Sequence, residues 1–128
     1  MPPSNLAALM LVAGLLAAPA SAQVQRNFPQ NALRGEISFE APPEIRINGR
    51  PQRLAPGVRI RGQNNMLEMS GALAGSRAPA HYTLDIGGEV SNVWLLRPEE
   101  LANRPWPRTP KESQEWLFDP TAQTWSRP

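Results

Sequence analysis

Proline is the residue that most limits how this chain can fold. Three of its 15 prolines lie in the first 22 residues, which leaves twelve in the remaining 106 of the 128 residues. A proline inside a helix removes a backbone hydrogen bond and clashes with the preceding turn, so long helices are excluded there. Prolines at such short spacing are typical of short β-strands joined by tight turns.

The first 22 residues have the pattern of a cleavable secretory signal peptide. Leu6–Ala18 is an uncharged apolar segment, Pro19 ends it, and Ala20 and Ala22 supply the small side chains that signal peptidase requires. A membrane span needs about 20 apolar residues. We therefore expect cleavage before Gln23, with an uncleaved membrane anchor as the alternative.

The rest of the chain, residues 23–128, is expected to be a single periplasmic domain with no stable membrane span after cleavage. Its first residues, 23–30, are expected to be a flexible lead-in anchored by Phe28. The sequence contains no cysteine. This excludes a lipidated cysteine, disulfides, thiol catalysis and cysteine-ligated metal sites, so the domain depends on its own hydrophobic core.

Alternating apolar and polar residues predict strands over much of this domain. The first two are Leu33–Phe39 and Glu44–Asn48. Asn48-Gly49 predicts a type I′ turn because both residues accept positive φ. Pro51 indicates that the returning strand is short or at an edge, and Pro56-Gly57 predicts another turn.

The clearest hairpin consists of His81–Ile86 and Glu89–Leu96, joined by Gly87-Gly88. In the first arm, Ile86 is expected to share an apolar face with Tyr82 and Leu84. The second arm is apolar on both faces, with Val93 on one and Trp94 on the other, which is typical of a central strand covered on both sides.

Two short helices are expected after this hairpin. Pro98–Ala102 has a proline at its first position and acidic residues near the positive helix end. Thr109-Pro110-Lys111-Glu112 is a capping box that opens a helix to about Leu117, where Trp116 and Leu117 would close over the sheet. The predicted fold is α+β, mainly antiparallel β: a small single sheet or partly open barrel with two short C-terminal helices.

Arginines dominate the first part of the domain. Residues 26–77 hold eight arginines against four glutamates, and twelve of the 13 basic residues of the chain are arginine. Because arginine binds carboxylate and phosphate bidentately, this predicts a basic face for an anionic envelope component such as lipid headgroups or peptidoglycan carboxylates. The alternative is solvated surface cations. The candidate binding residues on these strands are Arg46, Arg59 and Arg61.

All four tryptophans lie in the last 35 residues, and one is flanked by arginines. In the segment Arg104-Pro105-Trp106-Pro107-Arg108, two prolines hold the backbone extended around the ring. A tryptophan beside guanidinium groups can bind a sugar or a peptide by stacking and cation–π contact. We therefore predict an exposed anchor with Arg104, Trp106 and Arg108 as candidate binding residues. The alternative is that the tryptophans seal the helices onto the sheet.

Candidates for catalysis are few. His81 is the one histidine of the chain and has no nucleophile motif beside it, and no set of zinc ligands is available. Asp85 and Glu89 flank a turn and could form a carboxylate pair of the kind that cleaves glycosidic bonds. We expect no enzyme activity, no catalytic residue, no metal and no cofactor, with a small carboxylate-dependent hydrolase as an alternative.

Two segments carry motifs with a family likeness. One is Phe28-Pro29-x-x-Ala32-x-x-Gly35; the other is Tyr82–Leu96, with Gly88-x-Val90 at its turn, followed by Trp116-Leu117-Phe118-Asp119-Pro120. Together they resemble the C-terminal domain of TonB-type energy transducers, which implies an adaptor that pairs an edge strand with a partner peptide. The whole chain also resembles a group of small uncharacterised exported proteins of proteobacteria, which implies the periplasm.

The sequence thus favours a non-enzymatic periplasmic domain that contacts a protein or an anionic envelope component. A TonB-like adaptor and a small hydrolase are the alternatives. The isoelectric point near 9.9 would also suit nucleic acid, but export removes the protein from the compartment that holds nucleic acid, so no such partner is expected.

Amino-terminal sequencing of the protein isolated from its native host tests the expected export. The sequence should begin at Gln23, and the protein should fractionate with the periplasm. A protein that begins at Met1 and fractionates with the cytosol would contradict the signal peptide.

Overall fold

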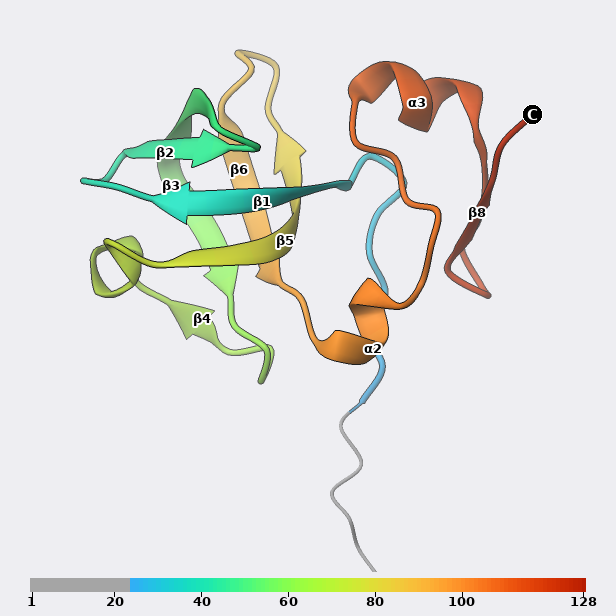
Figure 1. The fold of residues 1–128 in the computed structure, drawn as a ribbon, viewed down its shortest axis with the longest axis horizontal. Helices are drawn as coiled ribbons and strands as arrows, with labels where there is room; N and C mark the ends of the chain where they lie inside the picture. Colours follow the sequence, from blue (N-terminus) through green and yellow to red (C-terminus); the bar gives the residue numbers. More distant parts are fainter. Residues whose placement is uncertain (1–23) are drawn as a thin grey trace, which may run out of the picture.

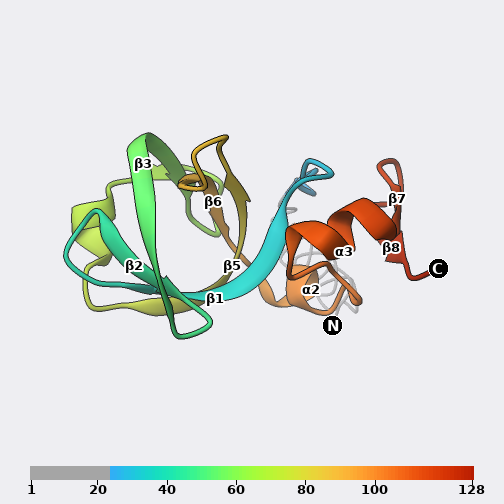
Figure 2. The ribbon, with the colours of Figure 1, turned by 90° about the horizontal axis from the view of Figure 1, so that it is seen from above.

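The computed structural model describes residues 24–128, so the expected signal peptide lies outside the described residues. The described chain forms two parts that lie side by side, a β-barrel and a C-terminal unit (Figures 1 and 2). The barrel strands are β1 (Leu33–Phe39), β2 (Glu44–Ile47), β3 (Arg50–Arg61), β5 (Arg77–Leu84) and β6 (Val90–Leu95). The short strand β4 (Leu67–Glu68) and the 3-10 helix η1 (Ser70–Leu73) lie between β3 and β5. The C-terminal unit contains α2 (Pro98–Leu101), α3 (Pro110–Glu115), β7 (Leu117–Asp119) and β8 (Thr124–Ser126).

Five strands close into a ring in the order β1-β2-β3-β6-β5, with β5 returning to β1. All of these contacts are antiparallel except the parallel pair of β3 and β6. The ring therefore leaves none of the five strands as a free edge.

The predicted β-rich fold with two short helices is confirmed, but the barrel is closed where a single sheet or a partly open barrel was expected. Closure depends on β3, whose first half pairs with β2 and whose second half pairs with β6. This second contact joins strands that are far apart in the sequence, and local alternation of residues carries no signal for it.

Strand β3 is longer than its prolines predict. The Asn48-Gly49 turn is confirmed, since both residues have positive φ. Pro51 is tolerated because it pairs with β2 alone, before β6 joins the strand at Leu54. The turn expected at Pro56-Gly57 is wrong: these residues lie within β3, in an irregularity between Leu54 and Arg59 that shifts the register with β6. Such a bulge bends a strand from one partner to the next.

Apolar side chains from all five strands fill the barrel. The buried set is Leu33, Ile37, Phe39, Ile45, Ile47, Leu54, Ile60, Ala80, Tyr82, Val90 and Val93. Ile86, expected on the same face as Tyr82, is fully exposed instead. It lies in the turn beyond Leu84, where β5 ends, so the alternation of the strand no longer sets its direction.

A second apolar cluster attaches the C-terminal unit to the outside of the barrel. Its buried members are Phe28, Ala32, Leu96, Trp106 and Trp125. Strand β6 contributes to both clusters, with Val93 inside the barrel and Trp94 against the second cluster, as its two apolar faces predict. Leu117 is exposed, contrary to expectation, because α3 ends at Glu115 and Leu117 begins β7. Among residues 24–128, no helix is long and apolar enough to cross a membrane.

Replacing Ile60 tests the barrel interior, with Leu67 as the matched control. Ile60 is 1% exposed and Leu67 is 62% exposed. Ile60→Ala should lower the free energy of unfolding by about 2–5 kcal/mol because it opens a cavity, whereas Leu67→Ala should change it by less than about 0.5 kcal/mol. Urea denaturation measures both, and equal effects of the two substitutions would contradict the core described here.

Candidate anion-binding cleft

Ion pairs neutralise part of the basic face expected on the barrel. Arg46 lies 3.1 Å from the Glu40 carboxylate, and other pairs join Arg53 to Glu44 and Glu89 and Arg77 to Glu36. Arg59 and Arg61 form no ion pair with the described residues, and Arg61 donates to the Asn65 carbonyl at 3.3 Å. Of the candidates Arg46, Arg59 and Arg61, Arg46 alone has an ion-pair partner among the described residues, and none of the three lines the cleft described next.

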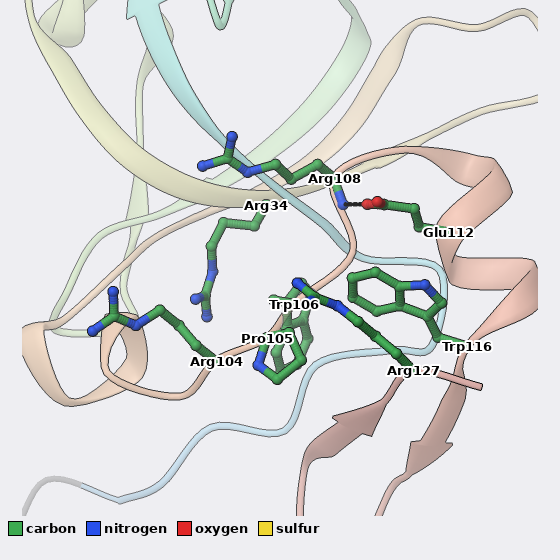
Figure 3. A pocket seen from close by; sticks show the side chains of 8 residues that line it. All are labelled: Arg34, Arg104, Pro105, Trp106, Arg108, Glu112, Trp116 and Arg127. Carbon is green, nitrogen blue, oxygen red and sulfur yellow. Dashed lines mark hydrogen bonds between the residues drawn. The ribbon is translucent and has the colours of Figure 1, made fainter.

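Unpaired arginines gather instead in the C-terminal unit, around a hollow of about 610 Å³ (Figure 3). We call it the arginine–tryptophan cleft. It is lined by Arg34, Arg104, Pro105, Trp106, Arg108, Glu112, Trp116 and Arg127. Arg104, Trp106 and Arg108 were predicted from the sequence, and the structure brings these three together. Arg34, Trp116 and Arg127 join them only through folding.

Local contacts fix the walls of the cleft. The Arg34 backbone N–H on β1 donates to the Pro107 carbonyl at 2.9 Å, which holds the 104–108 segment against the barrel. Thr109 caps α3, as predicted, by accepting from the Glu112 N–H at 3.2 Å. The Glu112 carboxylate in turn accepts from the Arg108 N–H at 2.9 Å. At the other side, the Arg127 guanidinium lies 5.0 Å from the centre of the Trp116 ring.

The cleft is strongly cationic. Arg104, Arg108 and Arg127 are exposed and form no ion pair with residues 24–128, while Glu112 is the one acidic side chain in the lining. Burial, aided by the charges of Arg104 and Arg108, lowers the pKa of Arg34 to about 10. Arg34 stays charged at neutral pH, so the arginines repel one another and an anion between them would relieve this repulsion.

Trp106 is not the exposed anchor that its flanking prolines predict. It is 5% exposed, its indole N–H donates to the Ala32 carbonyl at 2.9 Å, and its ring stacks on His81 at 4.2 Å between centroids. The alternative, that tryptophans seal the C-terminal unit onto the barrel, is the arrangement observed for Trp106. The ring that remains partly exposed in the cleft is Trp116.

Arg34 supports the cleft from beneath, and the sequence contains no local signal for this role. Its side chain is buried on the outside of β1, beside His81 of β5. Its Nε donates to His81 Nε2 at 3.1 Å, and its other nitrogens donate to the carbonyls of Glu100, Leu101 and Asn103. The Glu100 carbonyl also accepts from the Asn103 N–H, so the Leu101 and Asn103 carbonyls are the ones that depend on Arg34.

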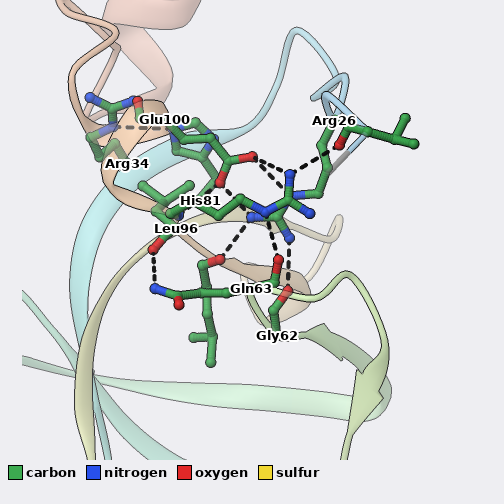
Figure 4. Close-up of polar contacts among 10 residues, drawn as sticks. Arg26, Arg34, Gly62, Gln63, His81, Leu96 and Glu100 are labelled. Atoms are coloured by element: carbon green, nitrogen blue, oxygen red, sulfur yellow. Dashed lines mark hydrogen bonds and ion pairs between the residues drawn. The ribbon is translucent and has the colours of Figure 1, made fainter. Parts of the chain in front are cut away.

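A second buried network ties down the chain before β1 (Figure 4). Arg26 Nε donates to the Glu100 carboxylate at 2.9 Å, and Arg26 also donates to the Gly62 and Leu95 carbonyls. Burial alone would raise the pKa of Glu100, but hydrogen bonds from Arg26 and from the Arg97 backbone keep it below its usual range. The lead-in is thus anchored by Arg26 as well as by Phe28, which is buried as predicted.

The carboxylates considered for hydrolysis have structural partners. Asp85 accepts from the Glu89 N–H at 2.9 Å across the turn, and the Glu89 carboxylate lies 3.6 Å from Arg53. In the part of the chain that the structure describes, no three histidine, aspartate or glutamate side chains lie close enough together to hold a metal ion.

The stability of the protein should depend on the one histidine. Burial, and then the charges of Arg34 and Arg26, lower the pKa of His81 to about 2, whereas an unfolded histidine titrates near 6.5. Between these pH values the unfolded chain binds a proton that the folded chain does not, so the free energy of unfolding falls as the pH is lowered. The loss from pH 6.5 to pH 5 should be about 1–2 kcal/mol. Urea denaturation at both pH values measures it.

The variant His81→Phe is the control for this pH dependence. It keeps an aromatic ring between Phe28 and Trp106 but cannot titrate. Its free energy of unfolding should therefore change less over the same pH interval than that of the native protein. An identical pH dependence in both proteins would show that His81 is not the group responsible.

No protein-family model, curated protein or solved structure matches this chain. The chemistry of the cleft therefore follows from its own residues: guanidinium groups that bind anions, an indole face, and a single carboxylate already engaged by a backbone N–H. This set of groups is suited to binding, because arginine does not exchange protons at neutral pH and a general acid–base pair needs groups that do.

Proposed function

We propose that this protein is a non-enzymatic periplasmic domain that binds an anionic partner in the arginine–tryptophan cleft. The observation that carries the proposal is the distribution of ion pairs. Arg46, Arg53 and Arg77 on the barrel are paired with glutamates, whereas three exposed arginines without an ion-pair partner among residues 24–128 are gathered around one hollow. The periplasmic location rests on the signal-peptide pattern.

The geometry supports binding of a group that carries carboxylate or phosphate. Guanidinium groups bind such oxyanions through paired hydrogen bonds, and bonds to a charged partner are stronger than neutral ones. The hollow of about 610 Å³ lies within the usual range for ligand sites. Trp116 adds an apolar face on which a flat or ring-shaped part of the ligand can lie.

The fold by itself does not assign a ligand, because one barrel architecture serves many functions. The adaptor alternative has three short strands with a free edge to use among the described elements: β4, which pairs with β3 alone, and β7 and β8, which pair only with each other. Edge-strand pairing uses backbone hydrogen bonds and does not require a negatively charged partner. A partner that binds without carrying negative charge would therefore favour the adaptor over the cleft.

Removing charge from the cleft tests the proposal. The double variant Arg104→Ser/Arg108→Ser should bind anionic probes at least about tenfold more weakly, because each lost charge-assisted hydrogen bond contributes roughly 1.5–3 kcal/mol. The probes are polyglutamate, polygalacturonate and phosphatidylglycerol vesicles, measured by titration calorimetry at low and high salt. Binding should weaken as salt rises.

The matched control is Arg59→Ser/Arg61→Ser, which removes the same charge from the barrel. It should bind the same probe within about twofold of the native protein, since neither residue lines the cleft. Equal weakening in both double variants would mean that net charge alone attracts the probe. Failure of the native protein to bind any of the three probes would refute the proposed function.

A further inference from the structure

A second hollow of about 440 Å³ adjoins the arginine–tryptophan cleft. Its lining includes Asn48, Arg50 and Gln52 at the β2–β3 turn, together with Arg108 and Thr109 before α3. Arg108 lines both hollows, so the two meet at this side chain. We call the two hollows together the groove; their linings extend from Trp116 in the C-terminal unit to Arg50 on the barrel.

Positive charge is spaced along this groove. Arg104 and Arg127 stand at the cleft, Arg108 at the junction and Arg50 at the far end. Arg50 is exposed and, like these three, has no ion pair within the described range. A compact anion would contact one hollow alone. A chain with repeated negative charges can contact the arginines of both.

The groups between the arginines are hydrogen-bonding groups suited to hydroxyls. The Asn48 side-chain oxygen accepts from the Glu36 N–H, and the Gln52 side-chain oxygen accepts from the Arg53 N–H, which leaves both amide NH2 groups as donors. The Thr109 hydroxyl oxygen accepts from the Glu112 backbone N–H, so the hydroxyl hydrogen remains free to donate to a ligand. The Glu112 carboxylate keeps further lone pairs that can accept from a hydroxyl.

Three features therefore coincide in one groove: spaced guanidinium groups for carboxylates, neutral donors and one carboxylate for hydroxyls, and the Trp116 face for a sugar ring. An acidic glycan presents all three complementary groups along its length. An acidic peptide presents carboxylates and backbone amides but no sugar ring for the Trp116 face.

Resting on the proposed function, we infer that the anionic partner is a linear acidic polysaccharide that carries carboxylates and occupies both hollows, with Arg50 as its distal contact. Arg50 then makes the protein prefer longer glycans over shorter ones. The cleft holds one part of the glycan, and the second hollow adds affinity only when the glycan is long enough to pass Arg108.

Galacturonate oligomers of defined length test this inference by titration calorimetry. The native protein should bind hexagalacturonate at least about tenfold more tightly than digalacturonate, because the longer chain adds charge-assisted contacts. Maltohexaose, which has the same length and hydroxyls but no carboxylate, should bind far more weakly. Arg50→Ser should lower the affinity for hexagalacturonate about tenfold and leave the affinity for digalacturonate within about twofold of the native value. Arg104→Ser/Arg108→Ser should lower the affinity for both oligomers.

Arg59→Ser is the matched single-charge control and should bind both oligomers as the native protein does. The circular dichroism spectrum and urea midpoint of Arg50→Ser should match the native values, since Arg50 is exposed beside a turn. Equal affinity for both oligomers, or equal weakening of both by Arg50→Ser, would overturn the inference while leaving anion binding in the cleft intact. Tighter binding of hexaglutamate than of hexagalacturonate would assign the groove to an acidic peptide and also overturn it.

Discussion

The buried guanidinium of Arg34 is the interaction on which the arrangement of both parts depends. It joins β1 to His81 on β5 and to three carbonyls at the end of α2, while the backbone N–H of the same residue holds Pro107. Its loss would leave the buried His81 Nε2 without a partner, at a cost of roughly 1–3 kcal/mol, and would free the Leu101 and Asn103 carbonyls. The positions of Arg104, Trp106 and Arg108 thus depend on a residue that is already fully engaged beneath them.

Charge pairing decides where positive potential remains on this molecule. Two acidic residues of the second half of the chain pair with arginines of the first half. Glu100 pairs with Arg26 as well as with its neighbour Arg97, and Glu89 lies beside Arg53. The more acidic half of the sequence therefore supplies the more cationic site, which a count of charges along the chain cannot reveal.

The elements that the sequence predicts well are those with local signals. The strand Leu33–Phe39, the Asn48-Gly49 turn and the Thr109 cap each follow from neighbouring residues, and each is present. Barrel closure is missed because the β3–β6 pair joins distant segments across a bulge. In the site, Arg104 and Arg108 can be predicted because they flank Trp106 in the sequence. Arg34 and Arg127 are brought to the cleft only by the fold. The burial of Trp106 could not be predicted, because it depends on its contact with His81 of β5.

The ring closure of the barrel also determines when the domain can fold. Strand β1 pairs with β5 from Leu33 opposite Tyr82, and the last strand to enter the ring, β6, ends at Leu95. A growing chain that has produced only β1, β2 and β3 has no β5–β6 pair to complete the cylinder, and its apolar interior stays open to water. Folding dominated by such long-range pairing is slow compared with that of helical bundles. The barrel therefore cannot close before the chain has been made as far as Leu95 of its 128 residues.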